Sequence, residues 1–424
     1  MSKDKHIPQG YKESPLGIIP KEWEVKRLDT LFSFKNGINA NKESYGDGIP
    51  FVNTMDVLNN TFLKTDVLRG KVNVSPKTKE EFCVVYGDVL FNRTSETREE
   101  VGCSSVYIDT EEAVFGGFVI RAHDISSNDF YDFFKGYCFQ PFYIRSQIVS
   151  LGNGAIRYNL GQEDLSRVKI LVPPIIEQQR IVSVLQLWDS AIEKQSELIE
   201  KLKLRKRALM QQLLTGKKRL PGFSGKWIHV PIKTFAKELS NRNIDGINYI
   251  VLSCTKYDGL VPSLKYFGKQ IYSNDLSSYK IIPQGHFAYA TNHIEEGSIG
   301  YQSNYENGLI SPMYTVFSTD NKMVDDTFLF AVLKSHHLIY LYQSMMEGSI
   351  NRRGGLRWDS FSTIKIDLPP LNEQKAISAF LKDADKEIEL ANEKLASLQS
   401  QKRGLMQQLL TGKKRITLLS LNIC

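Results

Sequence analysis

The sequence predicts an α+β fold with two globular units separated by two long antiparallel coiled-coil helices, arranged as a pseudo-two-fold internal repeat. Three observations predict it. The eleven letters LMQQLLTGKKR at 209–219 recur unchanged at 405–415, which marks a duplication. Each copy closes a charged segment whose apolar residues alternate at spacings of four and three, as in a coiled-coil seam. The segment before each helix contains short runs rich in Val, Ile, Tyr and Phe, which are typical of strands.

The duplication extends beyond the eleven letters and sets the expected domain boundaries. The Pro-Pro and Glu-Gln pairs that open each helical segment lie 196 residues apart, and the same offset relates Phe134 to Phe330. Near the N-terminus, Trp23 matches Trp227 at an offset of 204, and the sequences in between resemble each other little. We therefore expect two globular units with divergent sequences, each followed by a preserved helix. The expected segments are 1–172 and 220–368 (globular), 173–219 and 369–415 (helical), and 416–424 (an apolar tail).

Each globular unit is expected to be built from short strands followed by one helix. The strand-like runs are 82–92, 104–108 and 113–121 in the first unit, and 248–253, 281–290 and 313–317 in the second. The expected helices are 129–150 and 325–346. Glycine or aspartate lies between these runs, as expected where a chain turns between strands.

The two long helices are delimited by their sequences. The seam positions are Ile181, Leu185, Trp188, Ile192, Gln195, Ile199, Leu202, Lys206, Leu209 and Leu213 in the first, and Ile377, Leu381, Ala384, Ile388, Ala391, Leu395, Leu398, Lys402, Leu405 and Leu409 in the second. Pro174 and Pro370 suit a first helical turn, and Gly216 and Gly412 suit the residue after the last one. Each helix would have about 40 residues and a length of about 60 Å.

The link between the first helix and the second unit favours an antiparallel pair. About ten residues, 217–226, can span at most about 35 Å. The second unit then lies near the end of the first helix, and the second helix must run back from there. Trp188 opposite Ala384 would give large-to-small complementarity across the pair. The alternative, in which each helix packs separately on a globular unit, stays open.

The net charge of +7 is concentrated on the repeated helical segments. From 177 to 219 there are ten basic and five acidic residues, and from 373 to 415 there are nine and six, so the rest of the chain is nearly neutral. Basic residues in a last helical turn complement the helix dipole, which is a structural interpretation of the two KKR ends. A phosphate-facing patch is the functional interpretation.

Several classes of protein are disfavoured by the sequence. No run approaches the roughly 18 apolar residues of a membrane span, and the first residues do not form a signal peptide, so we expect a cytoplasmic protein without a membrane partner. The five cysteines are scattered and odd in number, which indicates neither a disulfide framework nor a zinc site. Phosphate-binding, dinucleotide-binding, zinc-protease and hydrolase motifs are absent. We expect no catalytic residues, metal ligands or bound cofactors on this chain.

Two glycine-rich loops at equivalent positions are the first candidate DNA-binding sites. The loop GNGAIRYN at 152–159 carries Arg157 and Tyr158, and the loop GSINRRGGLRW at 348–358 carries Arg352, Arg353, Arg357 and Trp358. Glycine lets the backbone approach closely, arginine can form paired hydrogen bonds to guanine or phosphate, and an aromatic ring can pack on a sugar or base. The structural alternative is a solvated loop whose arginine packs on the neighbouring helix.

The second pair of candidates follows an expected strand in each unit. These residues are Asn92, Arg93, Thr94 and Arg98 in the first unit and Thr291, Asn292 and His293 in the second. Both groups are dense in side chains that can contact bases, yet they differ from each other. Two domains that recognise different DNA sequences would need loops that differ on a fold that is the same. The structural alternative is that these are ordinary polar turns without a function.

The chain resembles the specificity subunit of type I restriction-modification systems. The resemblance rests on LVPPIIEQQRI at 171–181 and DLPPLNEQKAI at 367–377, on the long helices ending in LMQQLLTGKKR, and on IPKEW and SGKW at the start of the units. It covers nearly the whole chain. The apolar segment 416–424 departs from the pattern.

The resemblance implies two target-recognition domains, each reading one half of a bipartite, asymmetric site in double-stranded DNA. It also implies that the helices set the spacing and dock two methyltransferase subunits, and that restriction and translocase subunits join the complex. S-adenosylmethionine, ATP and Mg²⁺ would then be bound by these partner subunits. The alternatives are a self-contained DNA methyltransferase or nuclease, disfavoured by the missing motifs, and a structural coiled-coil spacer, disfavoured by two large, unlike globular units.

Overall fold

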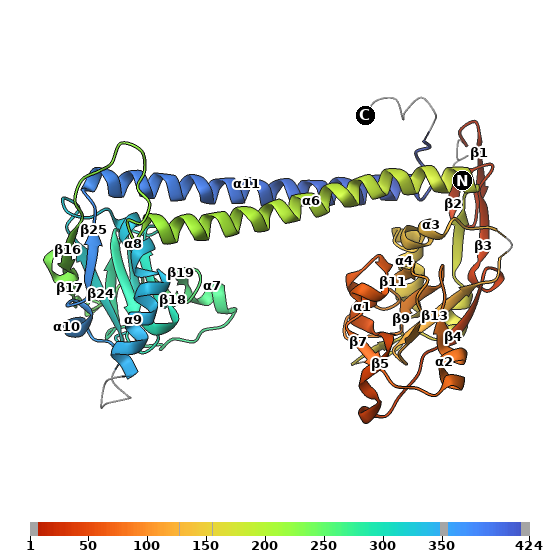
Figure 1. The fold of residues 1–424 in the computed structure, drawn as a ribbon, viewed down its shortest axis with the longest axis horizontal. Helices are drawn as coiled ribbons and strands as arrows, with labels where there is room; N and C mark the ends of the chain where they lie inside the picture. The colour runs from red at the N-terminus through yellow and green to blue at the C-terminus, as the bar shows by residue number, and fades with distance from the viewer. Residues whose placement is uncertain (1–6, 127, 155, 348–354, 417–424) are drawn as a thin grey trace. The chain divides into compact units, whose positions relative to one another are not determined.

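The computed structural model describes residues 7–126, 128–154, 156–347 and 355–416 (Figure 1). The chain forms two compact units: unit 1 contains 1–195 and 394–424, and unit 2 contains 196–393. The long helices are α6 (Ile175–Leu213) and α11 (Leu371–Leu409), of 39 residues each. Each unit therefore contains one part of α6 and one part of α11, together with a β-rich domain.

Unit 1 holds two main sheets. The strands are β1 (Tyr11–Ser14), β2 (Gly17–Pro20), β3 (Glu24–Arg27), β4 (Phe32–Asn36), β5 (Tyr45–Val52), β6 (Phe62–Leu63), β7 (Gly70–Val72), β8 (Cys83–Val84), β9 (Val89–Asn92), β10 (Thr94–Ser95), β11 (Ser104–Tyr107), β12 (Ala113–Phe115), β13 (Val119–Asp124), β14 (Tyr158–Asn159) and β15 (Lys169–Val172). One sheet has the order β4-β13-β9-β11-β6 and the other β7-β5-β12-β8, while β3 pairs with β15. The helices are α1 (Thr54–Asn59), α2 (Pro76–Phe82), α3 (Asp132–Cys138), α4 (Phe142–Leu151) and α5 (Gln162–Ser166).

Unit 2 repeats this arrangement. Its strands are β16 (Ile228–Pro231), β17 (Ala236–Leu239), β18 (Ile250–Thr255), β19 (Gly259–Pro262), β20 (Lys280–Pro283), β21 (His286–Ala290), β22 (Ile299–Gln302), β23 (Asn307–Ile310), β24 (Tyr314–Thr319) and β25 (Lys365–Leu368). The sheets have the orders β17-β24-β21-β22 and β19-β18-β23-β20, and β16 pairs with β25. The helices are α7 (Ser263–Phe267), α8 (Asp326–Leu333), α9 (His336–Glu347) and α10 (Trp358–Phe361).

The two strand orders match element by element, although the two globular sequences resemble each other little. β13 lies between β4 and β9 in unit 1, as β24 lies between β17 and β21 in unit 2. In the second sheet, β5 and β12 run parallel, as do β18 and β23. Unit 1 additionally has β6 at the edge of its first sheet and the hairpin β1–β2. The predicted α+β fold with an internal repeat is confirmed.

Some expected elements are divided. The run 82–92 contains β8 and β9 around a turn at Gly87, and 281–290 contains β20 and β21 around Gly285, two glycines with positive φ. The single helix expected at 129–150 is two helices, α3 and α4, because Pro141 between them has no N–H to continue the hydrogen-bond ladder. The one expected at 325–346 is α8 and α9, where the Ser335 hydroxyl accepts from Leu338 N, 3.4 Å away, at the new helix start.

The long helices run antiparallel within each unit, and the predicted seam positions are confirmed. The expected pairing of Trp188 with Ala384 is wrong, because Asp189, next to Trp188, pairs with Lys402, and Asp385, next to Ala384, pairs with Lys206. In unit 1, Lys402 of α11 pairs with Asp189 of α6. In unit 2, Arg205 and Lys206 of α6 pair with Glu387 and Asp385 of α11. All twenty predicted seam positions are buried or half-buried. None of the helices among the described residues has the length and apolarity required to cross a lipid bilayer.

The helix ends are part of the two hydrophobic cores. In unit 1, Leu185 of α6 and Leu409 of α11 pack in one cluster with Trp23, Phe91 and Phe134. In unit 2, the matching cluster contains Leu213 of α6 and Leu381 of α11 together with Phe287, Phe328 and Phe361. Each domain is thus packed on the start of one long helix and the end of the other, which fixes its orientation to that part of the helix pair.

The same charged cluster joins these ends in both units, and we call it the Glu–Arg–Trp cluster. In unit 1, the Arg415 guanidinium donates to both oxygens of Glu177, at 3.0 and 2.8 Å, and Trp23 Nε1 donates to Glu177 Oε2 at 2.9 Å. These hydrogen bonds raise the pKa of Arg415. In unit 2, Arg219 forms the same bidentate pair with the fully buried Glu373, and Trp227 Nε1 lies 3.2 Å from Glu373 Oε2.

The glutamines next to these glutamates fasten each helix start to its domain. Gln178 accepts from Tyr131 N at 2.8 Å and donates to the Asp129 and Pro173 carbonyls. Gln374 is equally buried, accepts from Asp325 N and donates to the Met323 and Pro369 carbonyls. The repeated Glu-Gln pair therefore has a structural role, since in each unit both side chains have their hydrogen-bond partners within that unit.

The two KKR ends follow a glycine that closes the helix. Gly216 and Gly412 have φ of +66° and +68°, and Lys218 N and Lys414 N donate back to the Gln212 and Gln408 carbonyls. Glycine adopts this left-handed conformation without steric cost, and it ends each helix. The helix-stop interpretation is confirmed for both ends.

The two closing glycines predict unequal effects of the same substitution. Gly216→Ala should cost about 1 kcal/mol, the usual cost of a Cβ in the left-handed region, because the added Cβ would lie 3.5 Å from Trp227, an ordinary contact. Gly412→Ala should cost more, because its Cβ would lie 2.4 Å from Pro20. Thermal unfolding of the two variants under one buffer compares them. Equal losses would contradict the role of the Pro20 contact.

Candidate nucleic-acid interface

In unit 1 the two candidate loops meet at one surface. β10 pairs with β14, so that Thr94 lies opposite Asn159 and Ser95 opposite Tyr158. The Thr94 hydroxyl donates to Asn159 Oδ1 at 2.7 Å. The Arg98 guanidinium lies over the Tyr158 ring, 5.9 Å from its centroid. The loop after β9 and the glycine-rich loop after α4 therefore form a single candidate interface.

Arg157 is an exposed cation of this interface. Its side chain is 62% exposed, and Glu96, at 3.7 Å, is more exposed still. Such a surface pair contributes little to stability, so the guanidinium can exchange this partner for a ligand. Arg157 lines a shallow recess together with Thr54, Thr94, Glu96 and Phe118.

Asn92 and Arg93 lie beneath this surface. Asn92 is fully buried in β9, and its amide nitrogen donates to the Glu100 carbonyl at 3.1 Å. Arg93 is half-buried and donates through Nη1 to the Gly117 carbonyl at 3.1 Å. These contacts favour a positioning role, in which both side chains hold the loop that carries Thr94 and Arg98.

In unit 2 the equivalent loops meet through the same backbone hydrogen bond. Leu356 N donates to the Thr291 carbonyl at 2.9 Å, as Leu160 N donates to the Arg93 carbonyl at 2.9 Å in unit 1. Gly355 is required at this approach, because a Cβ there would lie 2.1 Å from the Thr291 oxygen. The exposed Asn292 and Arg357 line one recess with Thr291 and Trp358.

The remaining predicted residues of this loop divide into two groups. The half-buried Trp358 starts α10 and packs on Phe317 and Phe361, with ring centroids 5.5 and 5.9 Å apart. Trp358 therefore has two roles: it lines the recess, and it anchors the recess to the aromatic core. Arg352 and Arg353 lie outside the described residues.

A half-buried lysine contributes to the same recess. Lys280 Nζ donates to the Tyr314 carbonyl at 2.7 Å and lines the recess with Glu238. Burial lowers the pKa of Lys280, and the nearby Glu238 opposes that shift. Lys280 was not predicted, because it lies at the start of a strand whose other residues are apolar.

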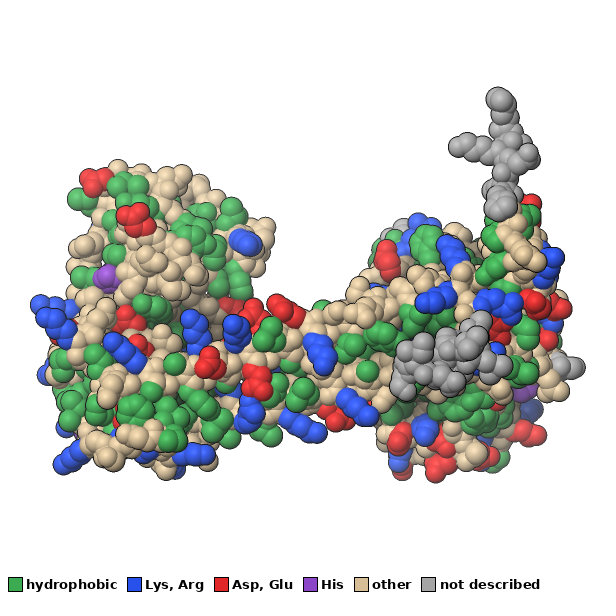
Figure 2. All heavy atoms as spheres, turned by 90° about the horizontal axis from the view of Figure 1, so that it is seen from above, with side chains coloured by type: hydrophobic (Ala, Val, Ile, Leu, Met, Phe, Trp, Pro, Cys, Tyr) green, Lys and Arg blue, Asp and Glu red, His purple; other side chains and the backbone are tan. Residues whose placement is uncertain are grey.

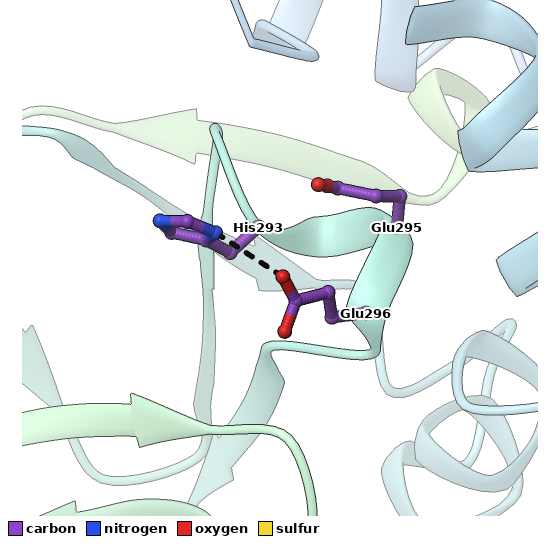
Figure 3. Close-up of side chains that lie close together, drawn as sticks. All are labelled: His293, Glu295 and Glu296. Carbon is purple, nitrogen blue, oxygen red and sulfur yellow. Dashed lines mark ion pairs between the residues drawn. The ribbon is translucent and has the colours of Figure 1, made fainter.

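His293 lies beside acidic rather than basic neighbours (Figure 3). Its Nδ1 is 3.6 Å from Glu296 Oε1, and a carboxylate oxygen of Glu295 lies within 4.8 Å of the other two groups. His293 and Glu296 are both more than half exposed. This local negative charge disfavours contact with a phosphate, although a carboxylate can accept a hydrogen bond from the cytosine amino group.

Five of the cations near the helix ends are held by intramolecular partners. Arg219 and Arg415 belong to the Glu–Arg–Trp clusters, and Arg205, Lys206 and Lys402 pair across the helices. On the helix surface seen in Figure 2, basic and acidic side chains are interspersed. The net charge of the helical segments therefore does not form a continuous basic stripe on this face.

Comparison with known proteins assigns the family. The family described as "Type I restriction modification DNA specificity domain" matches residues 20–204 and 232–400, one match for each copy of the repeat. The chain belongs to this family of type I specificity subunits. As such it is non-catalytic and recognises the DNA target site within a type I restriction-modification complex. A self-contained methyltransferase or nuclease and a purely structural spacer are thereby excluded.

Relatives of similar length support the assignment to the specificity subunits. The chain is 24% identical over 446 residues to the putative type I restriction enzyme MjaX specificity subunit of Methanocaldococcus jannaschii, covering 96% of this chain and 97% of that protein. It is 23% identical over 212 residues to the EcoKI specificity subunit of Escherichia coli, covering 47% and 44% of the two chains.

Two solved structures share the fold of this specificity subunit. The HsdS subunit from Thermoanaerobacter tengcongensis aligns with a TM-score of 0.54 and 17% identity, over 93% of this chain and 98% of that one. A chain from a study of complex assembly and conformational transition of the type I restriction-modification system aligns with a TM-score of 0.58 and 16% identity, over 93% and 99%.

Proposed function

We propose that each domain of this specificity subunit reads one half of a bipartite, asymmetric DNA site. The domains are taken as 1–172 and 220–368, the helical segments as 173–219 and 369–415, and 416–424 as a tail. The proposal rests on one observation. Each unit has a recess beside the same backbone hydrogen bond between its two loops, but different side chains line the two recesses. A shared frame with unlike side chains suits two unlike half-sites.

The proposed contacts come from residues that line each recess or lie on the loops beside it. Thr94, Arg98, Arg157 and Tyr158 would contact one half-site, and Thr291, Asn292, His293, Arg357 and Trp358 the other. Arg352 and Arg353 precede Arg357 in sequence and are proposed contacts of the second half-site as well. Arginine and asparagine can each form two hydrogen bonds to one purine edge, which distinguishes base pairs in the major groove. Asn92 and Arg93 would act by positioning the first loop.

The partner subunits would supply the chemistry. Because this chain is non-catalytic, adenine methylation with S-adenosylmethionine belongs to two methyltransferase subunits, which we propose to dock on the long helices. ATP- and Mg²⁺-dependent translocation and cleavage would belong to the restriction subunits. Action on cellular DNA places the complex in the cytoplasm.

Mapping methylated adenines in cells that carry the complete system tests the proposed function. The expected result is methylation at a single bipartite motif with two unlike halves and a fixed spacer. Exchanging the domain 220–368 for that of another specificity subunit should change one half of the motif and leave the other unchanged. A motif that changes in both halves, or an uninterrupted motif, would contradict the assignment of one domain to each half-site.

The long helices predict how the spacer length can be changed. Inserting one heptad into both helices, after Gln195 in α6 and after Glu393 in α11, keeps the seam periodicity and adds about 10 Å of helix. We expect the preferred spacer to lengthen by about three base pairs at 3.4 Å per step, with unchanged half-sites. Five-residue insertions, which break the seam, are the control and should abolish activity. A methylated motif with its original spacer after heptad insertion would rule out this role.

A further inference from the structure

Each unit exposes one large apolar side chain at the same place in its fold. Phe118 directly precedes β13 and is 60% exposed, and Met313 directly precedes β24 and is 64% exposed. β13 and β24 occupy equivalent central positions in their sheets. The two residues are chemically unlike, but both are large and apolar. The duplicated frame therefore presents an apolar group at one equivalent point of each unit.

Both residues are tied to the first residue of the candidate loops. Arg93 N donates to the Phe118 carbonyl at 2.8 Å, and Arg93 Nη1 donates to the neighbouring Gly117 carbonyl at 3.1 Å. In unit 2, the Thr291 hydroxyl donates to the Met313 carbonyl at 3.0 Å. Because Arg93 and Thr291 also accept the equivalent hydrogen bonds from Leu160 and Leu356, the apolar residue and the polar loop are held as one assembly.

The side chains around Phe118 and Met313 are those that hydrogen-bond base edges. Phe118 lines its recess with Thr94 and Arg157. Met313 lines its recess with Asn292 and Arg357. The other residues that line the first recess are polar, and in the second recess Met313 is more exposed than the aromatic Tyr314 and Trp358, which are half-buried. A surface that reads the major groove needs such a group, because the thymine 5-methyl is the apolar feature of base edges there.

We propose that Phe118 and Met313 recognise thymine, one in each half-site, by covering its 5-methyl group. The proposal rests on the proposed function, in which each domain reads one half-site. Arg157 and Arg357 would then supply hydrogen bonds, while Phe118 and Met313 distinguish thymine from cytosine at a neighbouring base pair. Covering one methyl group contributes about a four-fold change in affinity.

Replacing single thymines by deoxyuridine, which lacks only the 5-methyl group, tests the proposal. The full specificity subunit is assembled with its methyltransferase subunits, and its affinity is measured for the methylated motif with each thymine replaced in turn. We expect one replacement in each half-site to weaken binding about four-fold. Phe118→Ala should bind thymine and uracil equally at its position in one half-site, and Met313→Ala should do so in the other.

The chain offers a matched control for Phe118. Ile125 directly follows β13 and is 55% exposed, so Ile125→Ala removes a similarly exposed side chain at the opposite end of the strand from Phe118. This variant should keep the wild-type ratio of thymine to uracil affinity in both half-sites. Each alanine variant also serves as the control for the other half-site. If a variant binds too weakly for an affinity measurement, the methylation rates of the same duplexes give the ratio.

Three results would overturn the proposal. The first is a wild-type complex that binds its motif but does not distinguish thymine from uracil in either half-site. The second is an unchanged ratio in Phe118→Ala and Met313→Ala. The third is base unstacking, detected by 2-aminopurine fluorescence in the duplex, that occurs with the wild type and is lost in these variants. That result would indicate that Phe118 and Met313 insert between bases instead. Failure of the proposed function would give a different result: exchanging one domain would then not change one half of the methylated motif alone.

Discussion

Arg415→Ala is expected to lower the free energy of unfolding of unit 1 by about 2–3 kcal/mol. Removing one partner of a fully buried ion pair costs about 3–5 kcal/mol, because the other charge stays buried without compensation, and partial exposure of this pair reduces that cost. Glu177 is 7% exposed, whereas Arg415 is about one-third exposed. Without Arg415, Trp23 Nε1 remains as a donor to the Glu177 carboxylate. Chemical unfolding followed by tryptophan fluorescence measures the change, since Trp23 reports on this site.

Arg167→Ala is the control for this prediction. Arg167 belongs to the same unit, but its pair with Glu163 is exposed on both sides, so its loss should cost less than about 0.5 kcal/mol. The double variant Arg415→Ala, Glu177→Gln should recover part of the loss, because a neutral amide is less costly to bury. Arg219→Ala should act in the same direction on unit 2. Equal losses for Arg415→Ala and Arg167→Ala would refute the structural role of the Glu–Arg–Trp cluster.

Arg157→Ala is expected to weaken binding at one half-site by about 10- to 100-fold, and Arg357→Ala at the other. Both side chains are exposed in the recess of their unit, and the pair of Arg157 with Glu96 is exposed on both sides. The measurement uses the assembled complex and a set of duplexes in which every base pair of the motif is replaced in turn. A base contact predicts that discrimination relaxes at one base pair only.

The salt dependence of binding separates base contacts from phosphate contacts. If Arg157 binds a phosphate, the variant should lose affinity for all sequences, and the slope of log affinity against log salt should decrease by about one. Arg167→Ala, which removes an exposed arginine outside the recess, should leave both half-sites unchanged. Loss of both half-sites in either recess variant would contradict the assignment of one recess to each half-site.

The helices and the location of the candidate site were predictable because their signals are local or repeated. The seam recurs every seven residues, and the duplication placed equivalent loops in both units before any contact was known. The Glu–Arg–Trp clusters were not predictable, because Glu177 and Arg415 are 238 residues apart in sequence and meet only through antiparallel pairing. The sequence indicated the helix stop before Arg415, but it did not indicate the contact of Arg415 with Glu177.

The individual recess residues were harder to predict than the loops that carry them. Asn92 belongs to a residue type that reads adenine, yet β9 is buried on both faces and the Glu100 carbonyl holds the Asn92 amide inside the sheet. Phe118 and Met313 were missed because an apolar residue next to a strand is normally assigned to the core. Their exposure depends on the turn before β13 and β24, which neither periodicity nor composition determines.

The composition of the two units has a consequence for the order in which they can form during synthesis. Unit 2 is one uninterrupted segment, 196–393, whereas unit 1 combines 1–195 with 394–424. The core around Trp23 includes Leu409, and Glu177 pairs with Arg415. The first domain therefore cannot complete its core until residues more than 200 positions later have been synthesised. The second domain can complete its core before then. Until then the apolar residues of the first domain that pack on the end of α11 stay exposed, and exposed apolar surface of this kind is what chaperones bind. The first domain to be synthesised is therefore the last to reach its full stability.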